Sequence, residues 1–144
     1  MIFFASDHAG FNLKQVLVEY CKNELKLEVE DLGAHEQNPE DDYPEIIALA
    51  AKAVSENPEN RAIILGGSGQ GEAMVANRFP NVRAVVWYGG TKIPELSREH
   101  NDSNILSIGA RFVTEDEARM AVKAWLETDF SGEERHVRRL ANFS

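Results

Sequence analysis

The sequence has a single cysteine, no long hydrophobic run and no excess of positive charge. Cys21 has no second cysteine to pair with, so no intrachain disulfide forms, and we expect a reducing compartment such as the cytoplasm. All apolar runs are much shorter than the ~18 residues that a membrane span requires, and Met1-Ile2-Phe3-Phe4 lacks the basic start of a signal peptide. These absences favour a soluble cytoplasmic protein with no membrane partner.

Negative charge dominates the chain, and its distribution is uneven. The net charge is −9, and residues 1–60 account for all of it, with 13 Asp and Glu against 4 Lys and Arg, whereas residues 61–144 hold 11 of each. Nucleic acids and anionic membranes require a basic patch on their protein partner, so both are excluded. A small phosphate needs only local positive charge, which segment 135–139 provides.

Length and composition are those of one compact domain over residues 1–144. The hydrophobic content of 43% is enough for a substantial core, and a length of 144 residues leaves no room for a second domain. Cys21 falls on a helical stripe with Val16, Leu17, Tyr20 and Leu25, a position that favours core packing over chemistry.

Hydrophobic periodicity alternates between strand and helix along the chain. It predicts strands at 1–5, 27–31, 62–65, 84–87 and 105–108, and helices at 12–25, 44–55, from the glycine-rich segment through 77, at 93–99 and at 115–128. The strands are nearly continuous apolar runs, which is typical of a parallel sheet covered on both faces. We therefore predict an α/β fold, a three-layer αβα sandwich around a Rossmann-like five-stranded parallel sheet.

Polar and glycine residues that could bind a ligand follow three of the predicted strands. Asp7 and His8 come after the first strand, segment 66–72 after the third, and Arg111 shortly after the fifth. Ligands of such sheets bind beyond the carboxyl ends of the strands. These residues are therefore expected at a common edge of the sheet.

The glycine-rich segment Gly66-Gly67-Ser68-Gly69-Gln70-Gly71-Glu72 joins a predicted buried strand to a helix. Its glycines let the backbone approach a ligand closely, and the first helical turn directs unpaired N–H groups toward an anion. Glu72 stands where a base could reach the same ligand. The segment predicts chemistry on a small phosphorylated molecule.

Three other glycine motifs do not fit this segment. A Walker A loop would end in Gly-Lys-Ser/Thr, but the segment ends in Gly71-Glu72-Ala73, which makes ATP or GTP unsuitable ligands. A dinucleotide motif starting at Gly67 would need glycine in place of Glu72, which argues against NAD. A nucleophile elbow around Ser68 would need glycine in place of Gln70, so serine hydrolysis is only a minor alternative.

The motifs together resemble the ribose-5-phosphate isomerase B family, which also includes isomerases of allose and galactose 6-phosphates. The matching segments span residues 6 to 139: Ser6-Asp7-His8-Ala9-Gly10 with Leu13-Lys14, Asp42-Tyr43-Pro44, Gly67-Ser68-Gly69-Gln70-Gly71-Glu72 with Ala76-Asn77-Arg78, Arg98-Glu99-His100-Asn101-Asp102, and Arg135-His136. Many members carry a cysteine just before the glycine pair. This chain has Gly66 there and Glu72 at the end of the loop, and so resembles the glutamate branch.

The resemblance implies an aldose–ketose isomerase with Glu72 as the base. Such a reaction moves a proton from C2 to C1 through a cis-enediolate, and one carboxylate must reach both carbons. The helix start lowers the pKa of Glu72 and desolvation raises it, so the sequence leaves the net direction open. A first-turn glutamate that merely complements the helix dipole is the alternative.

The loop backbone is expected to stabilise the enediolate oxygen. Suitable donors are the N–H groups of Gly67, Gly69, Gln70 and Gly71, together with the Ser68 hydroxyl. Ser68 could instead bond only its own turn.

Further site residues are implied by the resemblance. His100 corresponds to the acid that opens the sugar ring, and Asn101 to a ligand of sugar hydroxyls. Asp7 and His8 correspond to substrate ligands, and Tyr43 could line the same pocket. Each of these residues also has a purely structural alternative. The alternatives are a surface loop position for His100, loop capping for Asn101, helix capping for Asp7 and packing for Tyr43.

Phosphate binding is assigned to the arginines near the end of the chain. Arg135 and Arg139 stand one helical turn apart and, with Arg111, could grip a terminal phosphate, with His136 as a weaker candidate. Pairing of these arginines with Glu133 and Glu134 on a solvated face is the alternative. In the resembling enzymes the tail arginines enter a partner's site, so we expect at least a homodimer, or a tetramer, with tail 131–144 reaching the partner.

Two alternatives to ribose 5-phosphate isomerisation stay open. One is isomerisation of a six-carbon sugar phosphate, and the other is a non-catalytic module that binds a phosphorylated metabolite. No Cys, His, Asp or Glu cluster has the spacing of a metal site, so neither a metal nor another cofactor is expected.

Overall fold

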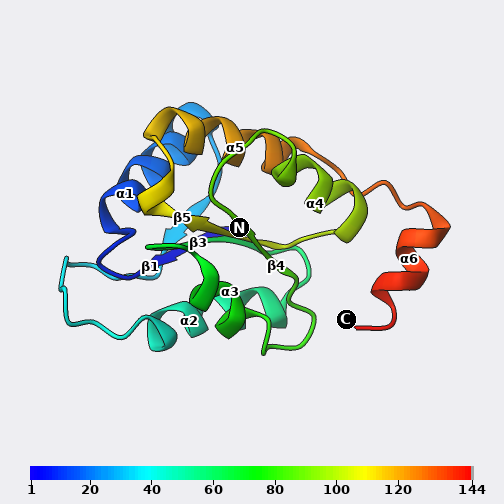
Figure 1. The fold of residues 1–144 in the computed structure, drawn as a ribbon, viewed down its shortest axis with the longest axis horizontal. Coiled ribbons are helices and arrows are strands. Elements are labelled where there is room, and N and C mark those ends of the chain that lie inside the picture. The colour runs from blue at the N-terminus through cyan, green and yellow to red at the C-terminus, as the bar shows by residue number, and fades with distance from the viewer. Residues whose placement is uncertain (144) are drawn as a thin grey trace.

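The computed structural model of the chain, which describes residues 1–143, is a three-layer αβα sandwich. Its central sheet is parallel, five-stranded and ordered β2-β1-β3-β5-β4 (Figure 1). The strands are β1 Ile2–Ser6, β2 Val29–Asp31, β3 Arg61–Gly66, β4 Ala84–Trp87 and β5 Ile105–Gly109. The predicted fold class is confirmed, although β2 is shorter than expected.

Helices cover both faces of the sheet. They are α1 Phe11–Glu19, α2 Tyr43–Glu56, α3 Gln70–Ala76, α4 Ile93–Asn101, α5 Glu115–Glu127 and α6 Glu134–Leu140, with a π-helical turn η1 at Tyr20–Glu24 and a 3-10 turn η2 at Ala110–Phe112. Figure 1 shows α1, α4 and α5 on one face and α2 and α3 on the other. The helix predicted over 12–25 is thus two pieces, since its last turn widens into η1. No helix among residues 1–143 is both long and apolar enough to cross a membrane.

The helix starts follow from local sequence. Helix α2 has Pro44 in its first turn, where the missing N–H leaves no bond unmade. Helix α5 begins with a capping box, in which Thr114 Oγ1 accepts from the Glu117 N–H at 3.1 Å and Glu117 Oε1 accepts from the Thr114 N–H at 3.3 Å. Both helices therefore begin within a residue of the predicted positions.

Each face of the sheet has its own hydrophobic cluster. Ile63 and Leu65 of β3 point into the cluster with Trp125 of α5, whereas Ile64 points into the cluster with Ala50 of α2. Because successive side chains of a strand alternate between faces, a strand buried on both sides must be apolar throughout. Cys21 is fully buried in the first cluster, and burial raises its pKa to about 12, which confirms its predicted packing role.

The topology opens a crevice at the carboxyl edge of the sheet. Strands β1 and β3 are neighbours, but α1, which follows β1, packs on one face and α3, which follows β3, on the other (Figure 1). The two connections therefore diverge, and a ligand can enter between them. Both connections carry residues singled out from the sequence.

Candidate active site

A cavity of about 390 Å³ lies at this carboxyl edge. It is lined by Asp7, Tyr43, Gly67, Ser68, Gly71, Glu72, Arg111 and Phe112. These residues come from the segments that follow β1, β3 and β5 and from the first turns of α2 and α3. The structure thus brings together most of the residues that were expected at one edge, and adds Phe112.

The glycine loop is fastened to the end of β5. The Ser107 hydroxyl donates to the Gly69 carbonyl oxygen at 2.7 Å, and a Cβ on Gly109 would lie 2.7 Å from the Ser68 carbonyl oxygen. Gly69 has φ +79°, a conformation that favours glycine. Sequence reasoning missed Ser107 and Gly109, and the only available signals were a serine inside an apolar strand and a glycine at its end.

Gly66 and Glu72 form a steric pair. The Glu72 side chain is only 4% exposed, and a Cβ on Gly66 would lie 1.8 Å from its Oε1. The carboxylate therefore occupies the space that any side chain at position 66 would take. This contact explains why glycine stands at position 66 in a chain that has glutamate at position 72.

The environment of Glu72 alters its pKa. Burial raises the pKa above the usual glutamate range, the nearby Asp7 carboxylate raises it further, and a hydrogen bond to the residue's own backbone N–H acts in the opposite direction. The net shift of the Glu72 pKa is therefore upward, because desolvation outweighs the opposing effect of the helix start. The sequence alone left the direction of this shift open. A carboxylate with a raised pKa is a stronger base once ionised.

Two side chains close over the glycine loop. A Cβ on Gly71 would lie 2.4 Å from the Tyr43 hydroxyl oxygen, so the tyrosine ring rests against the loop at that glycine. Arg111 lies over Gly67, since a Cβ there would be 3.0 Å from its Nη1, and its backbone N–H donates to the Gly67 carbonyl oxygen at 3.2 Å. Arg111 therefore places a cation at the cavity wall.

Ser68 is exposed at the cavity, and its oxygen accepts a hydrogen bond from the Gln70 N–H at 3.3 Å. This turn bond is the alternative that the sequence left open, and it leaves the hydroxyl hydrogen available for a ligand. Gln70 itself is exposed at the first residue of α3.

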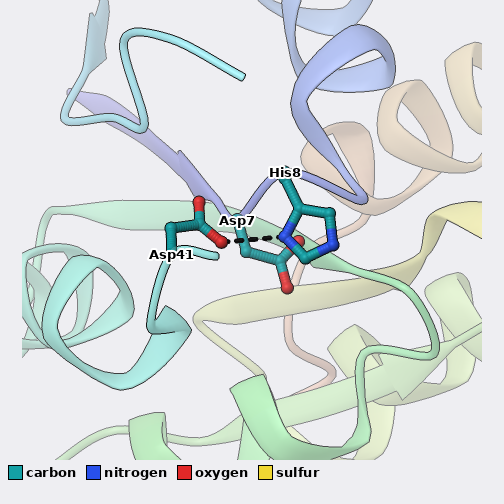
Figure 2. Close-up of side chains that lie close together, drawn as sticks. All are labelled: Asp7, His8 and Asp41. Atoms are coloured by element: carbon teal, nitrogen blue, oxygen red, sulfur yellow. Dashed lines mark hydrogen bonds and ion pairs between the residues drawn. The ribbon is translucent and has the colours of Figure 1, made fainter. Parts of the chain in front are cut away.

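Asp7, His8 and Asp41 lie together beside the cavity (Figure 2). Asp7 is 7% exposed, and its Oδ1 accepts from the N–H groups of Ala9 and Gly10 at 2.9 and 3.2 Å, so it stabilises the turn that leads into α1 as well as lining the cavity. His8 Nδ1 lies 2.8 Å from Asp41 Oδ1. No signal in the sequence singles out Asp41, because nothing in it pairs residues 33 positions apart.

This trio is also where the described residues could hold a cation. One ligand atom from each of Asp7, His8 and Asp41 lies within 4.8 Å of the others. Asp7 Oδ1 accepts two backbone hydrogen bonds and Asp41 Oδ1 pairs with His8 Nδ1, so one oxygen of each carboxylate is already engaged.

The other predicted residues lie at the opposite edge of the sheet. His100 and Asn101 are the last two residues of α4. The residues after them lead into the start of β5. There the Asn104 carbonyl oxygen accepts from the Ala62 N–H at the start of β3, which places this segment at the amino ends of the strands. Figure 1 shows α6, which carries Arg135, His136 and Arg139, at this same end of the molecule. None of these five residues lines the cavity of their own chain.

Helix α6 is anchored through a histidine pair. The rings of His100 and His136 stack with centroids 4.5 Å apart and planes at 19°. His136 is only 5% exposed, and burial, with His100 and the neighbouring arginines, lowers its pKa. Arg135 pairs with Glu133 at 3.0 Å, which is the solvated pairing considered above as the alternative for this arginine. Arg138 pairs with Glu134 at 2.9 Å. Arg139 has no ion pair among residues 1–143.

Comparisons with known proteins identify similar chains. The sequence profile of the family described as Ribose/Galactose Isomerase matches residues 2–143. The chain is 38% identical over 140 residues to ribose-5-phosphate isomerase B of Mycobacterium tuberculosis (strain ATCC 25618 / H37Rv), with 96% of this chain and 85% of that protein covered. It is 37% identical over 139 residues to ribose-5-phosphate isomerase B of Escherichia coli (strain K12), with 96% and 91% covered. The crystal structure of ribose-5-phosphate isomerase B from Mycoplasma genitalium with bound ribulose-5-phosphate is similar with a TM-score of 0.93 at 36% identity, covering 98% of this chain and 91% of that one.

Proposed function

Because the chain belongs to the ribose/galactose isomerase family, we infer that it interconverts ribose 5-phosphate and ribulose 5-phosphate. The single observation that carries the inference is the buried Glu72 carboxylate, which lines the cavity beside a loop of backbone N–H groups. The similar M. genitalium enzyme binds ribulose 5-phosphate, which supports this substrate over a six-carbon one.

Glu72 is the base of the proton transfer. After the sugar ring opens, its carboxylate removes the proton from C2 and returns it to C1 of the cis-enediolate. Burial strengthens this base, because little water competes for its charge and its pKa is raised. Gly66 has no side chain and so leaves the space that the carboxylate occupies.

The glycine loop stabilises the charge that develops on the enediolate oxygen. Backbone N–H groups of Gly67, Gly69 and Gly71 and the free hydroxyl hydrogen of Ser68 are the donors, whereas the Gln70 N–H already donates to Ser68 Oγ. Asp7, His8 and Tyr43 bind hydroxyls of the sugar at the other side of the cavity. No cofactor takes part in this chemistry.

A second copy of the chain completes the site. Five of the proposed site residues lie at the opposite edge of their own sheet. They are His100, the acid for ring opening, Asn101, a ligand of sugar hydroxyls, and the phosphate ligands Arg135, Arg139 and His136. A five-residue strand separates the two edges by about 16 Å, too far for one sugar phosphate to span. A homodimer with shared sites, or a tetramer of such dimers, brings tail 131–144 of one copy to Arg111 of the other; residue 144 lies outside the described residues.

The purified protein tests the activity directly. Ribose 5-phosphate should be isomerised much faster than allose or galactose 6-phosphate, and the rate should survive a metal chelator. Glu72→Gln should lower kcat by about 10³-fold and abolish exchange of the C2 proton with solvent deuterium, because the amide cannot accept that proton. Binding of ribitol 5-phosphate, a reduced analogue, should persist in the variant. Wild-type exchange rates in Glu72→Gln would refute the base assignment, and binding without any wild-type exchange would indicate a sensor.

Mixing two impaired variants, assayed at a substrate concentration well below KM, tests the shared site. Glu72→Gln and Arg139→Ala each damage a different half, so a heterodimer has one intact and one doubly damaged site. After random exchange of subunits, activity should recover to about a quarter of the wild-type value, because half of the dimers are mixed. Recovery should not exceed the sum of the separate variants if each chain forms its own site.

A further inference from the structure

Asp41, which pairs with His8, has no role in the chemistry described so far. Asp41 belongs to the segment between β2 and α2, in which residues 35–40 are all exposed. Its carboxylate is an exception, because the side chain is only 11% exposed and Oδ2 is buried without a hydrogen-bond partner among residues 1–143. The carboxylate is therefore turned inward, toward the turn that follows β1.

The pair lies at the margin of the cavity. His8 directly follows Asp7, and Asp41 precedes Tyr43 by two residues, and both Asp7 and Tyr43 line the cavity. The His8 side chain is 29% exposed, so it remains accessible to a ligand. Figure 2 shows the second ring nitrogen on the side of the imidazole that faces away from Asp41.

We propose that Asp41 is a positioning residue that acts through His8, holding the imidazole so that Nε2 meets a hydroxyl of the bound sugar phosphate. An ionised carboxylate can only accept, so His8 Nδ1 carries the hydrogen and donates to Asp41 across 2.8 Å. The neutral ring then has its lone pair on Nε2, which can accept a hydrogen bond from a sugar hydroxyl. This inference rests on the proposed function for the identity of the ligand.

A second attachment supports a defined position for His8. The Gln37 side chain lies 3.4 Å from the His8 carbonyl oxygen, so the same acidic segment contacts both the backbone and the ring of this residue. The segment thereby links one wall of the cavity to the turn after β1. Loss of the Asp41 carboxylate would free the ring while the Gln37 contact remains.

Steady-state kinetics on ribose 5-phosphate test the proposal. Asp41→Ala should lower kcat/KM about tenfold, as loss of a carboxylate behind a functional histidine commonly does. In a His8→Ala background the same change should have less than about a twofold further effect, because coupled residues are not additive. Asp41→Glu should restore part of the loss. Glu40→Ala, which removes an exposed acid of the same segment, is the matched control and should leave kcat/KM unchanged.

Nitrogen NMR of the labelled protein tests the tautomer independently of activity. The His8 signals, identified by their loss in His8→Ala, should show hydrogen on Nδ1 in the wild type and a mixture in Asp41→Ala. Addition of ribitol 5-phosphate should shift the Nε2 signal in the wild type. An unchanged Nε2 signal would show that the pair only fastens the segment, and would overturn the proposal.

Three further outcomes would also overturn it. They are an Asp41→Ala variant as active as the wild type, equal losses with and without His8, and Mn²⁺ binding at Asp7, His8 and Asp41 with activity that a chelator removes. If Asp41→Ala fails to fold, Asp41→Asn keeps the volume and should show a smaller loss in the same direction. A wild type inactive on ribose 5-phosphate would instead refute the proposed function, while the tautomer measurement would still report on the pair.

Discussion

The two edges of the sheet carry different kinds of functional residue. At the carboxyl edge, Glu72 and Asp7 are buried, and the glycine loop is held by Ser107 and Gly109. At the amino edge, the arginines of α6 are exposed and those at positions 135 and 138 pair with neighbouring glutamates.

Under the proposed function, this difference corresponds to a division of the catalytic work between two chains. A base and its oxyanion donors must be held rigidly and kept from water, and one chain provides this environment within its own fold. Phosphate binding and ring opening require charged and titratable groups that a second chain can deliver at its surface. Four predictions examine this contrast.

Gly66→Ala should have the largest effect. Its Cβ would overlap Oε1 of Glu72, and the overlap is relieved by rotation of a flexible side chain, so activity is lost more than stability. We expect kcat to fall about 10²-fold, in the range of a lost general base, with little change in the unfolding midpoint. Gly67→Ala is the matched control: it displaces Arg111 and should raise KM while solvent exchange continues. Similar behaviour of the two variants would argue against the steric pair.

Arg139→Ala should have the next largest effect, on KM. Loss of one phosphate contact should raise KM about tenfold, equivalent to about 1.4 kcal/mol, with a smaller change in kcat. Arg138→Ala removes a neighbouring arginine that pairs with Glu134 and should stay within about twofold of the wild type, because exposed ion pairs contribute little. Equal effects of both variants would mean that α6 acts only through its overall charge.

The pH dependence should report on the burial of Glu72. Catalysis requires the ionised carboxylate, so kcat/KM should fall as the pH drops through its raised pKa, above the range of an ordinary glutamate. Stability changes in the opposite sense. Between the ordinary and the raised pKa the folded state binds more protons than the unfolded state, so stability decreases as pH rises through this window. Denaturant unfolding of Glu72→Gln should lack this slope, and an identical slope in both proteins would contradict the assignment.

Cys21→Ala should have the smallest effect on activity. The thiol is fully buried, far from the cavity lining, and has a pKa of about 12, so we expect kcat/KM within about twofold of the wild type and very slow reaction of the native protein with thiol reagents. Rapid labelling of the folded protein that parallels inactivation would show that the thiol is accessible and functional.

Periodicity and turn chemistry were sufficient for the fold. The strand predicted at 84–87 coincides with β4, and the helix predicted at 115–128 begins at the same residue as α5, because both patterns depend on neighbouring residues. The helix predicted over 12–25 was less accurate, since nothing in its apolar spacing distinguishes an α-helical from a π-helical turn. The cavity residues at the ends of β1, β3 and β5 were also predictable, because a parallel sheet gathers the carboxyl ends of its strands.

Residue types and local spacing thus specified the layers and the position of the cavity along the sheet edge, and they led to Glu72 as the proposed base. Only the folded chain decided that burial raises the pKa of Glu72, that Gly66 makes room for it, and that Asp41 turns inward to His8. These facts depend on side chains that meet from distant parts of the chain, and desolvation and steric overlap exist only once those parts are packed together.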